Sequence, residues 1–230
     1  MDDLYSLDSE SLAALQPLRA FIFLFKWLPT SHDENVPQSG GEYDADFAGF
    51  FAHQVVNNAC ATLAVLNALG NIPSLTAGPE LTDLMSFTTG MDPQTRGLVI
   101  TSSDWLREAH NALSPPHAIS LDGLGLPKKA EDAYHFVVYL PAMGALYELD
   151  GLKQHSIRHG PFGSDGDWVK KARLARFDFT SKTIDHSLTH QGSHRNAYRD
   201  IPRWIRKFSR SRAFRALTLA ARIQFVSSPR

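Results

Sequence analysis

The sequence predicts a mixed α/β protein, and three features carry this prediction. Residues Ala20–Trp27 form a dense aromatic and β-branched run, typical of a strand buried on both faces. Residues Asn58–Gly70 are rich in Ala, Leu and Val, which favours a helix, and they include Cys60, the only cysteine. Residues Tyr134–Leu140 and Ala145–Asp150 are apolar segments that we expect to pair as strands. Helices are therefore expected around a central antiparallel sheet.

The segments before the cysteine helix are predicted in chain order. Residues Leu4–Leu7 are expected to form a short strand, and Asp8–Leu18 a helix that Pro17 limits. The run Ala20–Trp27 follows as the central strand. Residues Thr30–Asp44 are rich in Pro, Gly, Ser and acidic side chains, which predicts a loop.

The helix that carries Cys60 has recognisable end signals. Asn58 can cap its start through the side-chain oxygen, and Gly70 suits a left-handed closing residue. Cys60 then lies in the first turn, where exposed N–H groups and the helix dipole favour a thiolate. The alternative is a buried, inert cysteine, because free cysteines are often buried.

Two more helices and a long loop are expected before the paired strands. Residues Thr76–Thr89 and Thr101–Leu113 are the helices, the second capped by Ser102 or Ser103. Residues Ala112–Asp132 contain Pro115-Pro116 and two glycines that flank Leu124, and they are read as a loop. A loop of this length is usually a lid, a binding loop or a disordered segment.

The paired strands bring a histidine and a carboxylate together. If residues Pro141–Gly144 form the turn, Leu140 pairs with Ala145 and His135 lies directly opposite Asp150. Directly opposed side chains lie on one face of the sheet, about 4.5–5.5 Å apart at Cβ, so these two could hydrogen-bond. A bulge would shift this register, and a purely structural His–Asp pair is the alternative.

Bulk composition indicates a globular protein. At 230 residues and 43% hydrophobic content, the chain can bury one core. A single cysteine cannot form an intramolecular disulfide, which favours a reducing compartment, cytoplasmic or nuclear. The acidic N-terminus lacks the features of a signal peptide, and the longest apolar run, Ala20–Leu28, is too short to cross a membrane.

Charge divides the chain into two predicted parts. Residues 170–230 carry 15 Lys and Arg against 3 Asp and Glu, a net charge of +12, whereas residues 1–169 carry a net charge of −13. We therefore expect an acidic domain over 1–169 and a basic tail over 170–230. The tail segment Arg203–Arg215 mixes basic and aromatic residues, as nucleic-acid and membrane binders do, but a solvated, partly disordered or non-native tail is preferred. Neither nucleic acid nor a membrane is an expected partner.

The candidate residues fit one mechanism of thiol catalysis. Cys60 is the candidate nucleophile, His135 the general base, and Asp150 the residue that orients the imidazole. The developing oxyanion needs a donor, which the carboxamide of Gln54 or a backbone N–H at the helix start can supply. Gln54 could equally be an exposed loop residue.

No cofactor or metal is expected. The spaced histidines His186, His190 and His194 have no cysteine near them, so they do not resemble a zinc site. Gly123 and Gly125 lack the strand-to-helix context of a phosphate-binding loop.

Several separated blocks resemble the ubiquitin C-terminal hydrolases, a family of thiol deubiquitinases, and most of all its long, proteasome-associated branch. The resemblance covers about residues 3–168, and its blocks are Gln54–Thr62, Asp132–Val137, Leu146–Leu152, Phe23–Trp27 and Gly97–Asp104.

The resemblance implies a papain-like cysteine protease fold and hydrolysis of peptide, isopeptide or ester adducts of ubiquitin. It implies Gln54 as oxyanion donor, Cys60 as nucleophile, His135 as base and Asp150 as orienting acid. Residues Ala112–Asp132 would be the crossover loop, which restricts the conjugates that reach the cysteine. The implied partners are ubiquitin and its conjugates and, by resemblance alone, the proteasome.

The chain also departs from the family pattern. It starts about one strand and one helix late, and the final family strand is not recognisable in Lys170–Arg230. We therefore expect an incomplete family knot, an exposed sheet edge and weak activity. The alternatives are a catalytically weak or inactive ubiquitin-binding remnant and a cysteine peptidase of another papain-like family.

Overall fold

The structure is a computed structural model, and it describes most of the first 175 residues. The described parts are Leu12, residues 17–26, Pro37, residues 40–73, Leu75, residues 78–113, 134–164 and 167–175, and the strand at 223–227. The predicted strand Leu4–Leu7, the helix Asp8–Leu18 apart from Leu12, Pro17 and Leu18, and nearly all of the loop Ala112–Asp132 lie outside these residues. So do Arg203–Arg215 and the three spaced histidines, and the predicted knot involves the same undescribed segments.

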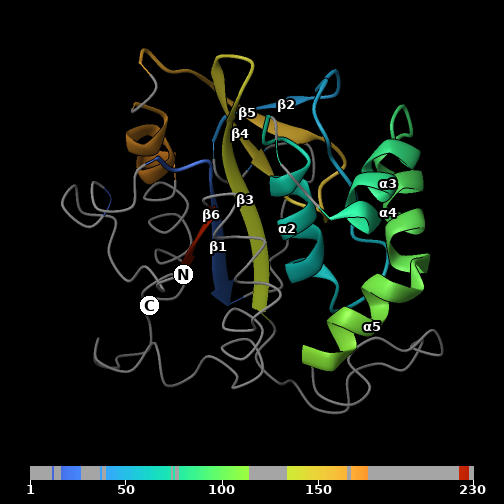
Figure 1. Ribbon diagram of the computed structural model, residues 1–230. Coiled ribbons are helices and arrows are strands. Elements are labelled where there is room, and N and C mark those ends of the chain that lie inside the picture. Colours follow the sequence, from blue (N-terminus) through green and yellow to red (C-terminus); the bar gives the residue numbers. More distant parts are fainter. Residues whose placement is uncertain are drawn as a thin grey trace, which may run out of the picture.

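A six-stranded sheet organises the described part of the chain, in the spatial order β2-β5-β4-β3-β1-β6 (Figure 1). The neighbouring strands are antiparallel except β1 and β6, which are parallel. The predicted central antiparallel sheet is thus confirmed. The strands are β1 Ala20–Lys26, β2 Glu42–Asp44, β3 Tyr134–Ala142, β4 Ala145–Leu149, β5 Ser156–Pro161 and β6 Ile223–Ser227.

Two strand predictions need correction. The expected loop Thr30–Asp44 ends in β2, whose pairing with β5 uses its last three residues. The tail was expected to add no strand and to leave a sheet edge open. Instead β6 pairs with β1 from Ala20↔Ile223 to Leu24↔Ser227. A helix over residues 167–175 also runs across the predicted boundary at 169, and the division into domain and tail stays a prediction.

Strand β1 is buried on both faces, as its continuous apolar run predicts. Ala20, Ile22 and Leu24 belong to the core that includes the cysteine helix. Phe21 and Phe23 point to a second core on the opposite face, where Phe21 packs 5.2 Å from the ring of Trp168 in the 167–175 helix. A strand with helices on both sides has no solvent-facing row, which accounts for the unbroken apolar run from Ala20 to Phe25.

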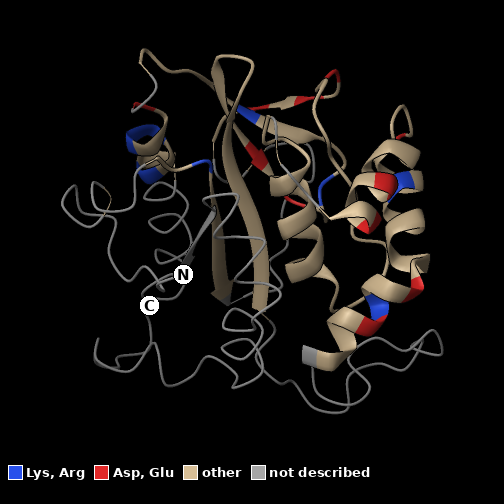
Figure 2. Ribbon diagram, viewed as in Figure 1, with Lys and Arg blue, Asp and Glu red and all other residues tan. Residues whose placement is uncertain are grey.

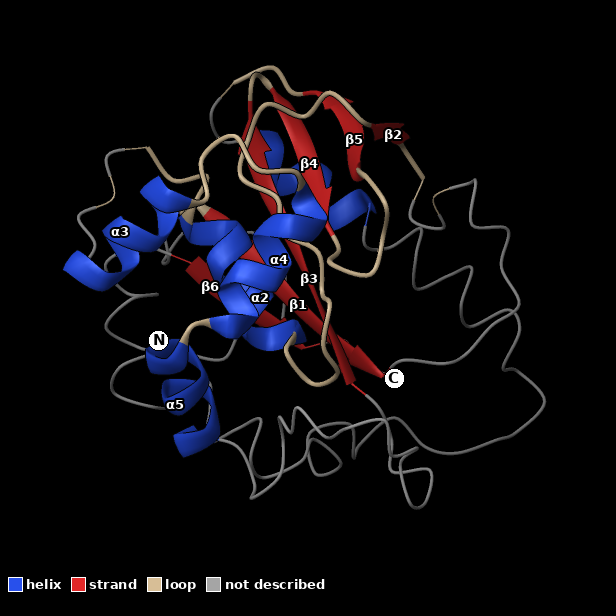
Figure 3. Ribbon diagram, turned by 90° about the vertical axis from the view of Figure 1, so that its right-hand side faces the viewer, coloured by secondary structure: helices blue, strands red, loops and turns tan. Residues whose placement is uncertain are grey.

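Four helices lie on one side of the sheet, and the 167–175 helix lies on the other (Figure 1). They are α2 Cys60–Leu69, α3 Pro79–Phe87, α4 Pro93–Ser102 and α5 Asp104–Leu113. Seen from the side, α2 and α4 lie in front of β1 and β3 (Figure 3). Neither α2 nor β3 carries Lys, Arg, Asp or Glu, whereas charged residues occur on α3, α4, α5 and the 167–175 helix (Figure 2).

The helix α4 was not predicted as a separate element. Its start is capped by Asp92, whose side chain accepts hydrogen bonds from the N–H groups of Gln94 and Thr95, and Pro93 occupies the first helical position. The predicted helix Thr101–Leu113 is accordingly two pieces, because α4 ends at Ser102 and α5 begins at Asp104.

Both predicted ends of α2 are wrong in detail. The capping position is Ala59, without a side-chain cap, and Asn58 adopts a left-handed φ of 64°. Gly70 has a right-handed φ of −64°, so it does not close the helix in a left-handed conformation. Glycine is required there for space, since a Cβ would overlap the ring of Phe50.

The hairpin of β3 and β4 has a shorter turn than predicted. Only Met143 and Gly144 form the turn, both with positive φ (48° and 72°), as in a two-residue hairpin turn of type I′. Leu140 therefore pairs with Tyr147 instead of Ala145. The register differs from the prediction by two residues, and a shift by an even number leaves every side chain on the face where it was expected.

Candidate active site

Cys60 lies in the first turn of α2, as predicted, and it is the first residue of that helix, at the point where the helix meets the sheet. The residue is only 8% exposed, and its Sγ lies 3.9 Å from the carbonyl oxygen of Tyr134 in β3. Because α2 packs against β3, the start of the helix lies beside the residue that follows Tyr134, which is His135.

His135 and Asp150 form a buried hydrogen-bonded pair. The imidazole Nε2 lies 2.6 Å from Asp150 Oδ1, and the two side chains are 6% and 9% exposed. Asp150 directly follows β4, and in the observed register it is a diagonal neighbour of His135 across the hairpin. The same Oδ1 accepts a hydrogen bond from the N–H of Leu152, which fixes the carboxylate. The predicted contact is confirmed, although the direct cross-strand pairing is wrong.

The site holds a charged pair. Burial alone would lower the pKa of His135, but the charge and hydrogen bond of Asp150, with smaller contributions from Cys60, raise it to about 10. Burial alone would raise the pKa of Asp150, but the charge and hydrogen bond of His135 hold it below its ordinary value. The imidazole is therefore protonated at neutral pH, and a positive charge lies next to the Cys60 thiol. An electropositive surrounding of this kind is typical of catalytic cysteines.

Gln54 lies in a loop that is joined to the residue after Asp150. Its N–H donates to the carbonyl oxygen of Gly151 over 2.7 Å, and a Cβ on Gly151 would lie 3.1 Å from that nitrogen. The Gln54 Oε1 is buried and has no hydrogen-bond partner among the described residues. The carboxamide is thus not tied through this oxygen to a structural hydrogen bond, and the predicted role of Gln54 as oxyanion donor stays a prediction.

Three buried or partly buried polar residues near this loop were not singled out in the sequence. Asn67 and Asn71 lie four residues apart, on and just after the otherwise apolar α2, and Arg96 lies in α4. All three bind backbone groups of the segment that leads to Gln54. Two asparagines at helical spacing on an apolar helix were the available signal, because such side chains need a partner when buried.

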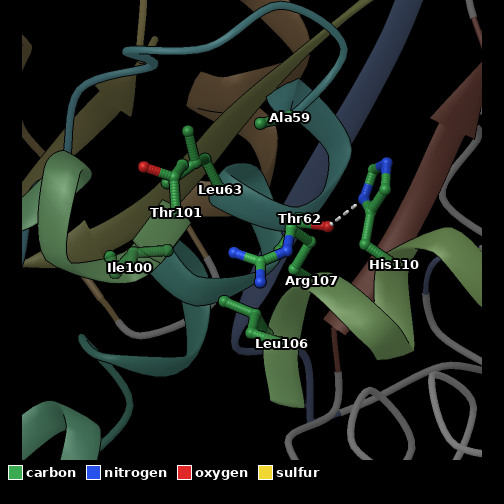
Figure 4. A pocket seen from close by; sticks show the side chains of 8 residues that line it. All are labelled: Ala59, Thr62, Leu63, Ile100, Thr101, Leu106, Arg107 and His110. Atoms are coloured by element: carbon green, nitrogen blue, oxygen red, sulfur yellow. Dashed lines mark hydrogen bonds between the residues drawn. The ribbon is translucent and has the colours of Figure 1, made fainter. Parts of the chain in front are cut away.

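A small, partly open pocket lies beside the start of α2 (Figure 4). It is lined by residues from the start of α2 and from α4 and α5, and Thr62 Oγ1 lies 2.7 Å from His110 Nδ1. Burial lowers the pKa of His110. This contact joins α5 to the helix that carries Cys60. The lining residues are Ala59, Thr62, Leu63, Ile100, Thr101, Leu106, Arg107 and His110.

The described residues hold no group of three His, Cys, Asp or Glu side chains that could bind a metal ion. Within the same part of the chain, no helix has the length and apolar character that a membrane span requires.

Comparison with known proteins identifies relatives of the whole arrangement. A family model described as ubiquitin carboxyl-terminal hydrolase, family 1, matches residues 1–177. Two relatives named ubiquitin carboxyl-terminal hydrolase BAP1, from Gallus gallus and Danio rerio, are each 36% identical over 183 residues. The alignments cover 75% of this chain and 26% and 24% of the relatives. This chain thus spans about a quarter of the length of the curated relatives that it matches.

Two solved structures share the fold. One is Trichinella spiralis UCH37 bound to ubiquitin vinyl methyl ester, with a TM-score of 0.60 and 32% identity, covering 83% of this chain and 67% of the other. The second is the catalytic domain of the same protein with the same ligand, with a TM-score of 0.62 and 33% identity, covering 83% and 80%. The predicted fold class is confirmed by these neighbours.

Proposed function

Because the chain belongs to family 1 of the ubiquitin carboxyl-terminal hydrolases, we propose that it is a thiol hydrolase that acts on ubiquitin. The reaction is cleavage of peptide, isopeptide or ester adducts after the C-terminal glycine of ubiquitin. The observation that carries the proposal is the buried pair of His135 and Asp150, 2.6 Å apart, beside Cys60 at the start of a helix. Because the chain belongs to this family, it is not a peptidase of another papain-like family.

In the first half of the reaction, Cys60 Sγ attacks the carbonyl carbon of the last ubiquitin residue and forms a C–S bond. The thiol proton resides on His135, whose raised pKa allows it to carry that proton at neutral pH. Asp150 accepts a hydrogen bond from Nε2–H and so leaves Nδ1 for the exchange with sulfur. When the tetrahedral intermediate collapses, the bond to the leaving amine or alcohol breaks and His135 protonates that group.

In the second half, water attacks the thioester carbonyl while His135 accepts its proton, and the ubiquitin carboxylate and the Cys60 thiol are released. Each half passes through an oxyanion, which must be stabilised by donors about 2.7–3.1 Å away. We assign this role to the carboxamide of Gln54, together with the N–H groups at the start of α2. The loop that carries Gln54 is held beside Asp150, because the Gln54 N–H donates to the carbonyl oxygen of Gly151.

Ubiquitin is the proposed partner because a structural relative with 32% identity is bound to a ubiquitin ester derivative. Association with the proteasome and a cytoplasmic or nuclear location are proposals from the family resemblance and the cysteine content.

The test is hydrolysis of ubiquitin that carries a fluorophore on its C-terminal carboxyl group. The chain should release the fluorophore, and Cys60→Ala should not. A second substrate, a short peptide with the same fluorophore and the last residues of ubiquitin, should be cleaved much more slowly, because it lacks the folded body of ubiquitin. No release by the folded parent chain, or equal release by Cys60→Ala, would overturn the proposal.

A further inference from the structure

We propose that Asn67 and Asn71 are positioning residues for the oxyanion donor. They hold the segment Phe50–Gln54 against α2 so that the Gln54 carboxamide and the Cys60 thiol form one rigid unit. This inference rests on the proposed function, since it concerns the oxyanion of that reaction.

Each asparagine binds both backbone groups of a single residue in the segment. Asn67 Oδ1 accepts from the N–H of Ala52 over 2.8 Å, and its Nδ2 donates to the Ala52 carbonyl over 3.1 Å. Asn71 Oδ1 accepts from the N–H of Phe50 over 2.9 Å, and its Nδ2 donates to the Phe50 carbonyl over 2.7 Å. The side-chain amides thus replace a neighbouring strand, because each offers one acceptor and one donor to an extended backbone.

The spacing of these bonds shows that the segment runs along the helix towards Cys60. Asn71 binds Phe50 and Asn67 binds Ala52, so four residues back along the helix correspond to two residues forward in the segment. Four helical residues rise about 6 Å, and two extended residues advance about 6.6 Å. The two repeats nearly match, and the next step along this register brings Gln54 towards the turn of α2 that carries Cys60.

The other face of the segment is held by α4. Arg96 is 8% exposed and its Nη1 donates to the Phe51 carbonyl over 2.5 Å. The N–H of His53 donates to the Pro93 carbonyl over 2.9 Å, and a Cβ on Gly97 would overlap the His53 carbonyl oxygen. The backbone groups of Phe51 and His53 therefore bond to residues of α4, whereas those of Phe50 and Ala52 bond to the two asparagines.

The end of the segment is bonded to the acid of the site. The N–H of Gln54 donates to Gly151, the residue after Asp150. The segments that carry Cys60, Gln54 and Asp150 are thereby linked to one another through these hydrogen bonds and short stretches of backbone. Displacement of a catalytic group by about 1 Å can cost about 100-fold in rate, so such a frame has a direct catalytic consequence.

Asn67 is the sharper position to test, because it is 1% exposed and binds the residue nearer to Gln54. Asn67→Ala removes both bonds to Ala52. We expect kcat on the ubiquitin–fluorophore substrate to fall about 10- to 100-fold at nearly constant KM. Alkylation of Cys60 by iodoacetamide should change less than about 2-fold, because this displacement at saturated carbon forms no oxyanion.

A double-mutant cycle separates positioning from a merely structural role. In a Gln54→Ala background the added Asn67→Ala change should lower kcat by less than about 3-fold, because the donor that it positions is already gone. The matched control is Tyr139→Phe, which removes a buried 2.6 Å bond to Glu148 on the opposite face of the sheet. This control should lower the thermal midpoint but leave kcat nearly unchanged.

The inference would be overturned if the kcat losses of the two single variants multiplied in the double variant. It would also be overturned if Asn67→Ala lowered the alkylation rate as much as kcat. In both cases the proposed function would stand. If the parent chain does not hydrolyse the substrate at all, the inference and the proposed function both fail. If Asn67→Ala does not fold, Asn71→Ala decides in the same assays, since it loosens the segment at Phe50, further from Gln54. A kcat for that variant equal to the parent's would then overturn the inference.

Discussion

The Nε2 of His135 lies 2.6 Å from Oδ1 of Asp150, in a pair of side chains that are both more than nine-tenths buried. In this contact the Nε2–H group donates to the carboxylate, so Nδ1 is the ring nitrogen that can exchange a proton with the thiol. It also sets the charge of the site, because the same carboxylate raises the pKa of His135 against the effect of burial.

Asp150→Asn keeps the shape of this side chain but removes its charge. The amide can present its NH₂ group to Nε2, which favours the wrong tautomer of His135, so kcat should fall by about 100-fold or more. Ubiquitin binding should be nearly unchanged, and it is measured on the Cys60→Ala chain with and without Asp150→Asn. Hydrolysis by Asp150→Asn at the parent's rate would show that Asp150 is not the orienting residue.

The raised pKa of His135 makes a signed prediction about stability. The pKa is raised from 6.5 to about 10, so its contribution to the free energy of unfolding is fully present below pH 6.5 and is lost as the pH rises to about 10. The thermal midpoint should therefore fall over this range relative to a His135→Asn/Asp150→Asn reference in which neither group titrates.

Both chains in that comparison carry Cys60→Ala, so that only the His–Asp pair titrates. Asp150 raises the pKa of His135 more than Cys60 does, so the direction is kept. A constant difference in thermal midpoint between pH 6.5 and 10 would contradict the assigned charge state.

Gln54→Ala tests the oxyanion donor itself. Loss of one such donor typically costs about 10²- to 10³-fold in kcat, and we expect a loss in this range on the ubiquitin–fluorophore substrate. The alkylation rate of Cys60 should stay close to the parent's. If kcat is unchanged, the oxyanion is stabilised by backbone N–H groups alone and the role of Gln54 is wrong.

Gly97→Ala tests how closely α4 approaches the segment before Gln54. A Cβ at this position would overlap the His53 carbonyl oxygen, so the segment must move, whereas alanine would otherwise favour the helix by about 1 kcal/mol. We expect a lower thermal midpoint and a lower kcat. The control is Gly78→Ala, where the nearest atom lies 3.6 Å from the added Cβ. If the Gly97 variant is as stable and active as the control, the segment is not held by this contact.

The sequence was sufficient for the features that composition and periodicity determine. Ala20–Lys26 forms a buried strand because its apolar run needs cover on both faces. Cys60 begins its helix, and His135 reaches Asp150 even though the register was misjudged, because a shift of two residues preserves the face of a strand.

The register error has an identifiable cause. The predicted turn Pro141–Gly144 begins with a proline, which lacks the N–H that a central strand normally uses. In the structure Pro141 pairs with Leu146 inside the hairpin, and the turn uses Met143, a non-glycine residue with positive φ. Neither choice follows local turn preferences, so the sequence offered no signal for the two-residue turn.

Contacts between distant segments could not be predicted from the sequence, for a different reason. Asn67 binds Ala52 across 15 residues, and β6 pairs with β1 across some 200 residues. Local composition does not encode such partners. The asparagines could have been noted as polar residues in an apolar helix, but their partners could not.

The most direct test of the proposed chemistry is covalent capture. The folded chain is incubated with ubiquitin vinyl methyl ester, and the product is measured by intact mass and peptide mapping. The account predicts a one-to-one adduct on Cys60, no adduct with Cys60→Ala, and slower capture with Asp150→Asn. A folded chain that forms no adduct, or an adduct on any residue other than Cys60, would contradict it.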